Sequence, residues 1–164
     1  MRNTIKHITS LILPVTVLII VPWIIGRDLS IKNITSFIIG LILIFTGLYL
    51  MVVTISAFIR IGKGTLAPWF PTNKLIVTGI YAYVRNPMII GVLTVLAGES
   101  IALLSVNIFI WAVTFFFINT IFFATYEEPS LKKRFGDEYL EYKRDVHRWV
   151  PRLKPFNPDS ELNH

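Results

Sequence analysis

Three charged side chains border the longest apolar stretch of the sequence, and together they could hold a small ionic ligand. Arg85 precedes the apolar residues 88–126, and Glu127 and Glu128 follow them directly. An arginine can bind a carboxylate through two parallel hydrogen bonds, and a carboxylate accepts hydrogen bonds from ammonium or hydroxyl groups. A site with both signs of charge suits a zwitterionic ligand. A structural interpretation is equally open, in which Arg85 anchors a helix end at a membrane surface and pairs with the glutamates.

Few other side chains in the sequence could do chemistry. The chain has no cysteine, which excludes disulfides, a thiolate nucleophile and a cysteine-bound metal. His7 and His147 are isolated and expected at the surface, so we predict no metal site. Glu99 lies inside the apolar stretch, where an acid is a candidate functional residue by default. We favour a structural role for it, either near the outer interface or as a protonated acid bonded to Asn107 or Ser100, over direct catalysis.

The composition indicates an integral membrane protein. Hydrophobic residues make up 54% of the 164 residues and the mean hydropathy is +0.63, which exceeds what one soluble domain of this size hides. The net charge of +6 could indicate nucleic-acid binding, but the basic residues are not interleaved with aromatic side chains on a soluble face. In a membrane protein such charge sets the topology and contacts anionic lipids. We therefore expect membrane lipids, and no nucleic acid, as partners.

The lengths of the apolar stretches predict four transmembrane helices. Residues 88–126 number 39, and at about 1.5 Å per residue they would span nearly twice the roughly 30 Å of a hydrocarbon core. They must therefore form two helices, which turn near residues 105–107. With the two earlier apolar stretches, the sequence predicts an all-α membrane protein with a single domain over residues 1–164. Its predicted spans are 8–25, 34–59, 88–104 and 108–126.

The distribution of basic residues predicts how these helices cross the membrane. The N-terminus, the loop 60–87 and the tail 127–164 together carry 14 lysine and arginine residues, whereas the opposite side carries only Arg27 and Lys32. By the positive-inside rule, both termini and the loop face the cytoplasm. Because the last two helices form a hairpin, Arg85 and the glutamate pair are expected to meet at one cytoplasmic site.

The tail predicts a C-terminal amphipathic helix at the membrane interface. Pro129, which follows two acids, is typical of a helix start. Apolar and aromatic side chains then recur at spacings of 4, 4, 3, 4 and 3, which places them on one helix face. Gly136 interrupts this pattern and marks a bend or a close approach. The residues of the predicted face are Leu131, Phe135, Tyr139, Tyr142, Val146 and Trp149.

Two segments carry a resemblance to a known family. Residues 79–91 read GIYAYVRNPMIIG, and residues 126–129 read YEEP. This pair resembles the signature of the integral membrane methyltransferases that include the isoprenylcysteine carboxyl methyltransferases and the phospholipid methyltransferases, and it resembles their bacterial members in particular. The similarity extends over residues 60–152. The direct matches to the family pattern are Arg85, Pro87, Gly91, Glu127 and Glu128.

The sequence departs from the family pattern at two positions. Asn86 stands where the family has histidine, and Ile89 stands where it has tyrosine. Asparagine donates and accepts hydrogen bonds, but it does not accept a proton as a base. Residue 86 is therefore expected to position a ligand and not to perform acid–base catalysis.

The resemblance implies that S-adenosylmethionine is the cofactor and that the methyl acceptor is a lipid, a prenyl-type molecule or another small hydrophobic molecule. It also implies a multi-pass protein of the bacterial inner membrane with a cytoplasmic active site. Arg85 and Glu128 are then the expected catalytic residues. The expected cofactor-binding residues are Tyr81, Tyr83, Arg85, Asn86, Pro87, Met88, Gly91, Glu127 and Glu128.

Two other functions stay open at this point. One is a membrane reductase of related architecture that uses a nicotinamide cofactor. The other is a non-enzymatic scaffold or lipid-binding protein in which the arginine–glutamate cluster is purely structural. A cofactor-binding assay on the purified protein separates the three functions.

Overall fold

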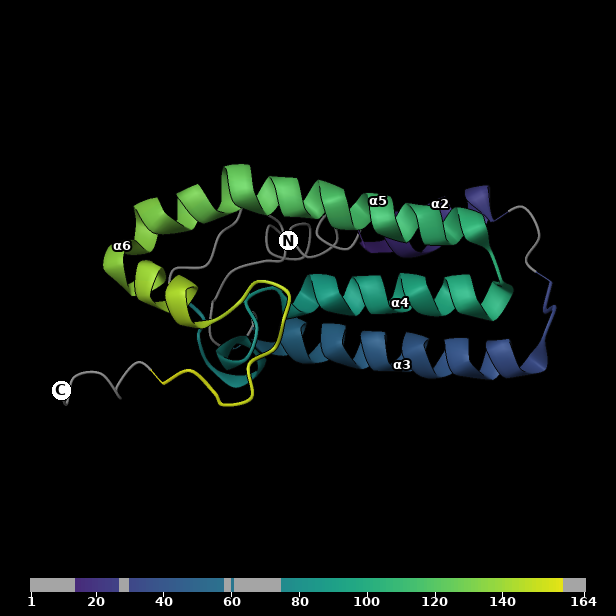
Figure 1. Ribbon diagram of the computed structural model, residues 1–164, viewed down its shortest axis with the longest axis horizontal. Helices are drawn as coiled ribbons and strands as arrows, with labels where there is room; N and C mark the ends of the chain where they lie inside the picture. The colour runs from purple at the N-terminus through teal and green to yellow at the C-terminus, as the bar shows by residue number, and fades with distance from the viewer. Residues whose placement is uncertain (1–13, 27–29, 58–59, 61–74, 158–164) are drawn as a thin grey trace, which may run out of the picture.

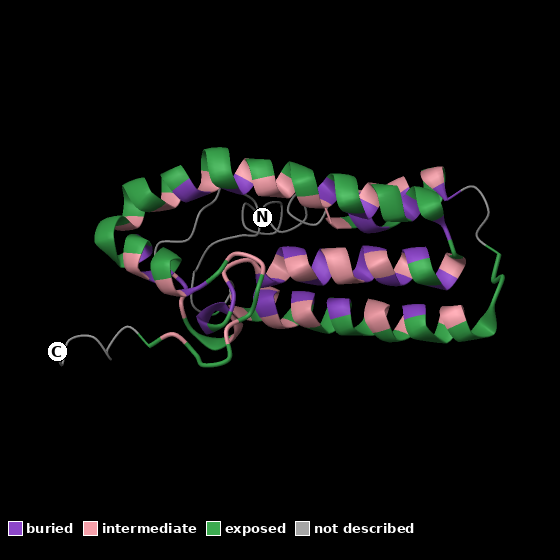
Figure 2. Cartoon of the chain, viewed as in Figure 1, coloured by how far each residue is buried: buried purple, intermediate pink, exposed green. Residues whose placement is uncertain are grey.

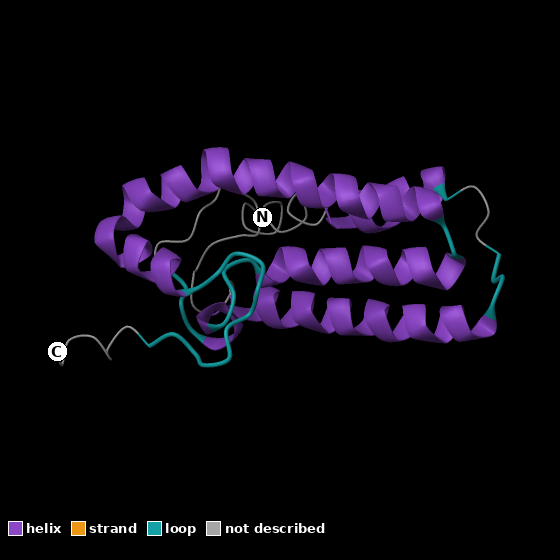
Figure 3. Ribbon diagram, in the orientation of Figure 1, coloured by secondary structure: helices purple, strands orange, loops and turns teal. Residues whose placement is uncertain are grey.

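The computed structural model describes residues 14–26, 30–57, 60 and 75–157, and this part of the chain is helical without a strand (Figure 3). The predicted all-α class is therefore confirmed over these residues. The helices, in chain order, are η1 (Thr16–Ile20), α2 (Val21–Ile25), α3 (Ile34–Ala57), η3 (Gly79–Ala82), α4 (Pro87–Leu103), α5 (Val106–Phe122), η4 (Phe123–Glu127) and α6 (Glu128–Asp145).

Two of the four predicted spans are long and apolar enough to cross a membrane. They are α3 and the continuous helical run Val106–Asp145, which begins with α5. The helix Thr16–Ile25 and α4 are also apolar but shorter. Residues 8–13 of the first predicted span, and the loop residues 61–74, lie outside the described part of the chain. The count of four spans therefore stays a prediction.

The long helices pack side by side, with α4 between α3 and α5 (Figure 1). The helices differ in burial because of this arrangement: α4 is covered on two faces, while α3 and α5 expose apolar side chains outward (Figure 2). The ends that carry residues 57, 87 and 122 lie together at one end of the bundle. This hairpin arrangement brings the two predicted site segments to the same place.

Glycines allow α3 and α4 to approach closely. A Cβ atom at Gly40 would lie 2.5 Å from the carbonyl oxygen of Gly98, and a Cβ atom at Gly98 would lie 2.7 Å from that of Gly40. The same reciprocal contact joins Gly47 and Gly91, with corresponding distances of 2.6 and 2.9 Å. Each glycine pair is therefore in direct backbone contact, as is common where membrane helices use small residues at their interface.

Proline shapes the first helix and its contact with α5. The segment η1 has the wide π register, in which the Val21 N–H donates to the Thr16 carbonyl five residues earlier. The next bond in this register would run from Pro22 to Val17, but proline has no N–H. The indole Nε1 of Trp111 donates to the Val17 carbonyl instead, at 3.1 Å. A side chain of α5 thus replaces the missing backbone donor.

The C-terminal helix reverses direction in its middle. Gly136 adopts φ 54° and ψ −127° inside α6, a conformation that favours glycine, and the second half of the helix folds back toward the bundle (Figure 1). Of the two interpretations of Gly136, a bend or a close approach, the structure shows the bend, and a Cβ atom there would meet nothing within 4 Å. The prediction of one helix with a continuous apolar face through Trp149 is wrong, because α6 breaks at Gly136 and ends at Asp145.

The folded-back half of α6 and the segment after it cover the loop before α4. The hydroxyl of Tyr142 donates to the Tyr81 carbonyl at 2.7 Å, and the Arg152 N–H donates to the Tyr83 carbonyl at 2.9 Å. The Phe156 N–H donates to the Ala82 carbonyl at 2.9 Å. One apolar cluster joins both halves of α6, the segment after it and the residues before η3. Its members are Tyr139, Tyr142 and Val146 with Leu75, Val77, Leu131, Phe135 and Phe156. Most of the predicted apolar face is therefore buried against protein.

Candidate functional site

The loop before α4 ends abruptly at the predicted position. Asn86 has φ −122° and ψ 57°, outside the helical region, and Pro87 opens α4. This follows from local chemistry, because proline disfavours helical geometry in the residue before it and is tolerated in a first helical turn. The backbone N–H of Arg85 donates to the His147 carbonyl at 3.0 Å. The C-terminal segment thereby holds the backbone of Arg85 in place.

The two glutamates lie where the long helix changes its hydrogen-bond register. The segment η4 is a π-helical turn that ends at Glu127, and the Glu128 N–H donates to the Phe123 carbonyl five residues earlier. Pro129 follows directly, just as Pro22 follows the last such bond of η1. A π turn rotates the residues after it relative to an α-helix, and such turns are frequent at functional sites. Here the turn precedes the side chain of Glu128, which points into the protein.

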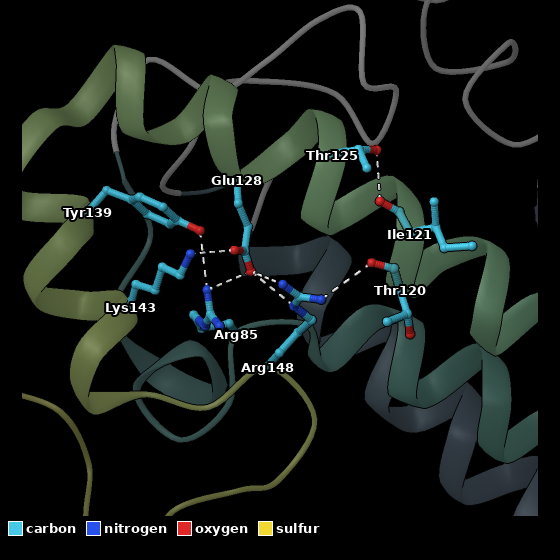
Figure 4. A network of polar contacts seen from close by, with 8 residues as sticks. All are labelled: Arg85, Thr120, Ile121, Thr125, Glu128, Tyr139, Lys143 and Arg148. Atoms are coloured by element: carbon cyan, nitrogen blue, oxygen red, sulfur yellow. Dashed lines mark hydrogen bonds and ion pairs between the residues drawn. The ribbon is translucent and has the colours of Figure 1, made fainter.

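The Glu128 carboxylate contacts three cations (Figure 4). Its Oε1 accepts from Arg85 Nη1 at 3.0 Å and from Arg148 Nε at 2.9 Å, and Arg148 Nη2 also contacts this oxygen. Its Oε2 pairs with Lys143 Nζ at 2.7 Å. Arg85 Nη1 additionally donates to the Tyr139 hydroxyl at 3.2 Å. Glu128 therefore links the loop, both halves of α6 and the C-terminal segment.

The neighbouring glutamates have pKa values shifted in opposite directions. Burial raises the pKa of Glu128, but hydrogen bonds from Lys143 and Arg148 and the charge of Arg85 outweigh burial and leave its pKa below the ordinary value. Burial, with a smaller contribution from the charge of Glu128, raises the pKa of Glu127 to about 7. Glu128 is thus ionised at neutral pH, whereas Glu127 exchanges a proton near neutral pH.

A cavity of about 80 Å³ opens beside these residues, larger than one buried water molecule needs. Its lining combines charged groups with aromatic and aliphatic side chains. Arg85 Nε and Asn86 Nδ2 belong to lining residues, are buried, and have no hydrogen-bond partner among the described residues. Buried donors without acceptors are uncommon, and these two could donate to an acceptor group of a bound ligand or to water. The lining residues are Leu75, Ile76, Tyr81, Arg85, Asn86, Phe123, Glu127, Glu128, Leu131, Tyr139 and Tyr142.

Five of the nine predicted cofactor-binding residues line this cavity, and the other four lie elsewhere. Tyr83 is exposed at the surface and Pro87 is fully buried at the start of α4. Met88 packs against the main apolar core. Gly91 faces α3, where its backbone contacts Gly47. These four positions shape the start of α4 and do not line the cavity.

Three polar side chains around Arg85 and Glu128 are not among the predicted site residues. Tyr139 was expected on an apolar face, and Lys143 and Arg148 were counted only as tail charges. The spacing of Tyr139 and Lys143 places them on one helix face, which is a weak signal that they act together. Arg148 lies beyond the end of α6, and no local pattern in the sequence marks it.

Glu99 does not make the bonds that the sequence suggested for it. The Ser100 hydroxyl donates to the Ser105 carbonyl at 3.2 Å, and Asn107 Nδ2 donates to the Ile25 carbonyl at 2.9 Å. Glu99 Oε2 is buried and has no hydrogen-bond partner within the part of the chain that the structure describes. The side chains of Ser100 and Asn107 thus bond to carbonyl groups at helix ends and not to Glu99.

Comparison with known proteins agrees with the resemblance seen in the sequence. A family model described as phospholipid methyltransferase matches residues 35–138, which is more than half of the chain. An uncharacterized protein of Haemophilus influenzae is 42% identical over 57 residues, which cover 35% of this chain and 81% of that protein. No solved structure matches the chain significantly. The matched family region contains the loop with Arg85, both glutamates and the helices between them, so the chain belongs to the phospholipid methyltransferase family.

Proposed function

We propose that the protein transfers a methyl group from S-adenosylmethionine to a lipophilic acceptor at the membrane. The observation that carries this proposal is the pair of buried donors, Arg85 Nε and Asn86 Nδ2, which lack partners among the described residues and belong to a cavity that Glu127 also lines. Adjacent donor and acceptor groups suit the carboxylate and the ammonium of an amino-acid moiety. Members of the matched family are methyltransferases, which supports the enzyme class.

Each cavity residue has a role that its chemistry fits. Arg85 would bind the cofactor carboxylate, and Asn86 would add a hydrogen bond without exchanging a proton. Glu127 would accept from the ammonium or from the ribose hydroxyls. The buried ring of Tyr81 lines the same cavity and would lie near the sulfonium. Glu128, predicted as catalytic, would act by orienting Arg85, because its oxygens already hold three cations.

When bound, S-adenosylmethionine supplies a methyl group that is activated by its attachment to a sulfonium. The protein then has to align this carbon with the acceptor and exclude water, and no covalent enzyme intermediate is needed. The apolar cluster around Tyr139 and Tyr142 borders the cavity and would exclude water from one side.

The acceptor would arrive from the lipid phase on the cytoplasmic side. The site lies at one end of the apolar helices, together with the basic C-terminal segment. Four spans with cytoplasmic termini would place this end inside, in accord with the excess of lysine and arginine. Reporter fusions that show the C-terminus outside the cytoplasm would contradict this topology.

A binding and labelling experiment tests the proposed function. Calorimetry on detergent-purified protein should show binding of S-adenosylhomocysteine and no binding of a nicotinamide dinucleotide, which is the cofactor of the alternative reductase. Membranes that contain the protein should transfer label from methyl-labelled S-adenosylmethionine into the lipid extract. Binding of the nicotinamide dinucleotide alone would support the reductase, and binding of neither would support a scaffold.

A further inference from the structure

The carboxylate of Glu128 is surrounded by more positive charge than it can neutralise. Arg85, Lys143 and Arg148 contribute three positive charges and Glu128 one negative charge, which leaves two positive charges in excess. The side chains of Glu128, Arg85 and Arg148 are 9%, 12% and 19% exposed, so solvent screens their charges only weakly, whereas Lys143 is 44% exposed and more strongly screened. Glu127 could offset at most one of the two charges when it is ionised. Binding of an added anion to this cluster is therefore electrostatically favourable.

Arg148 is held firmly in this cluster. Two of its guanidinium nitrogens contact Glu128 Oε1, and the third donates to the Thr120 carbonyl at 3.4 Å. The next residue, Trp149, packs on Phe116 and Phe123 with ring centroids 5.2 and 6.2 Å apart. The aromatic contacts anchor the segment after α6. Arg148, which lies in this segment, points toward Glu128 (Figure 4).

Arg85 and Arg148 share the same oxygen of Glu128. Because Arg148 and Lys143 take up much of the negative charge of this carboxylate, Arg85 is oriented by Glu128 without being fully neutralised by it. Arg85 Nη1 donates hydrogen bonds to both Glu128 and Tyr139, while Arg85 Nε has no partner in the residues that the structure describes. One side of the guanidinium is thus fixed and another stays available.

We propose that Arg148 is a positioning residue that keeps Arg85 oriented, with its charge only partly neutralised by Glu128, for the carboxylate of the bound ligand. This inference rests on the proposed function, because it takes the ligand carboxylate to be that of S-adenosylmethionine. Arg148 does not line the cavity, so we do not expect it to contact the ligand. Its substitution should therefore weaken binding only of ligands that carry the carboxylate.

Two ligands that differ in the amino-acid end, which carries this carboxylate, provide the test. S-adenosylhomocysteine has the carboxylate, and 5′-methylthioadenosine lacks the whole amino-acid end. Calorimetry on Arg148→Gln should show affinity for S-adenosylhomocysteine reduced about tenfold, because Glu128 then neutralises Arg85 more completely, with affinity for 5′-methylthioadenosine unchanged. Arg148→Lys, which keeps the charge, should restore part of the loss. The matched control is Arg144→Gln, because Arg144 is an exposed arginine of α6 that pairs with Asp145.

The outcomes separate the alternatives. Equal losses for both ligands would show a merely structural role and overturn the inference, and so would native affinity of Arg148→Gln for S-adenosylhomocysteine. If Arg148→Gln does not fold, Lys143→Gln replaces it, since Lys143 is 44% exposed and bonds to the other oxygen of Glu128. The same selective loss is expected there, and its absence would overturn the inference. If the native protein binds neither ligand, the proposed function itself fails.

Discussion

The guanidinium of Arg85 lies 3.0 Å from the carboxylate of Glu128, although the two residues are 43 positions apart in the sequence. The hairpin of α4 and α5 brings them together, and the contact orients Arg85 beside the cavity. The electrostatic environment of the cavity therefore depends on the helix packing as well as on the local motif.

Replacing Arg85 with alanine should weaken S-adenosylhomocysteine binding by about tenfold to a hundredfold, because a hydrogen bond to a charged group contributes about 1.5–3 kcal/mol. Arg85→Lys should restore little of the lost affinity, since an ammonium cannot reproduce the planar guanidinium that would contact both Glu128 and the ligand. Calorimetry measures the affinity, and a cooperative thermal transition confirms folding. Native affinity of Arg85→Ala would show that Arg85 does not bind the ligand.

Substitutions at Asn86 should separate hydrogen bonding from proton transfer. Asn86→Leu keeps similar bulk but removes the amide that lines the cavity, so cofactor affinity should fall. Asn86→His should retain methyl transfer, because imidazole also donates and accepts hydrogen bonds. The assay is transfer of labelled methyl groups to lipid extract. Full activity and affinity in Asn86→Leu would contradict the assignment of this residue.

Glu127 should make cofactor binding depend on pH. Its raised pKa of about 7 means that it is protonated below neutral pH and becomes an acceptor for the cofactor ammonium as the pH increases. Affinity should therefore increase with pH by up to about tenfold per unit below pH 7, and then level off. Calorimetry across this range on native protein and Glu127→Gln checks the assignment. The variant should bind more weakly and without this pH dependence, and an unchanged profile would exclude Glu127.

Trp111→Phe should destabilise the protein without altering the site. The substitution leaves the Val17 carbonyl without its donor, at a cost of about 1–3 kcal/mol for a buried unpaired group. The matched control is Trp23→Phe, since Trp23 is 70% exposed and its loss should change stability little. Thermal unfolding in detergent compares the two variants. Equal melting temperatures would show that the contact with Val17 contributes nothing to stability.

Local chemistry in the sequence was enough to predict several features of the site. The start of α4 at Pro87 follows from the restrictions that proline places on itself and on Asn86. The meeting of Arg85 with the glutamates follows from the length of residues 88–126, which forces a hairpin. A bend at Gly136 was one of two interpretations of that residue, because glycine adopts conformations that other residues avoid.

Only the tertiary structure distinguishes the two glutamates from each other. Both follow the same helix and look equivalent in the sequence, but Glu128 contacts three cations while Glu127 lines the cavity with a raised pKa. It also placed Gly91 against α3 instead of the cavity. These outcomes depend on which side chains approach from distant segments, and residue spacing does not encode that approach.

The sequence by itself thus determined an all-helical chain, the family to which it belongs and the ends of the hairpin where its charged residues meet. Hydrophobic length and proline geometry act over a few residues, so they can be read locally. Only the tertiary structure added Arg148 and Lys143 to Glu128, because the chain has to reverse at Gly136 and return across the loop before these cations reach it. Burial then strengthens their interaction with the carboxylate, and burial is a property of the packed molecule.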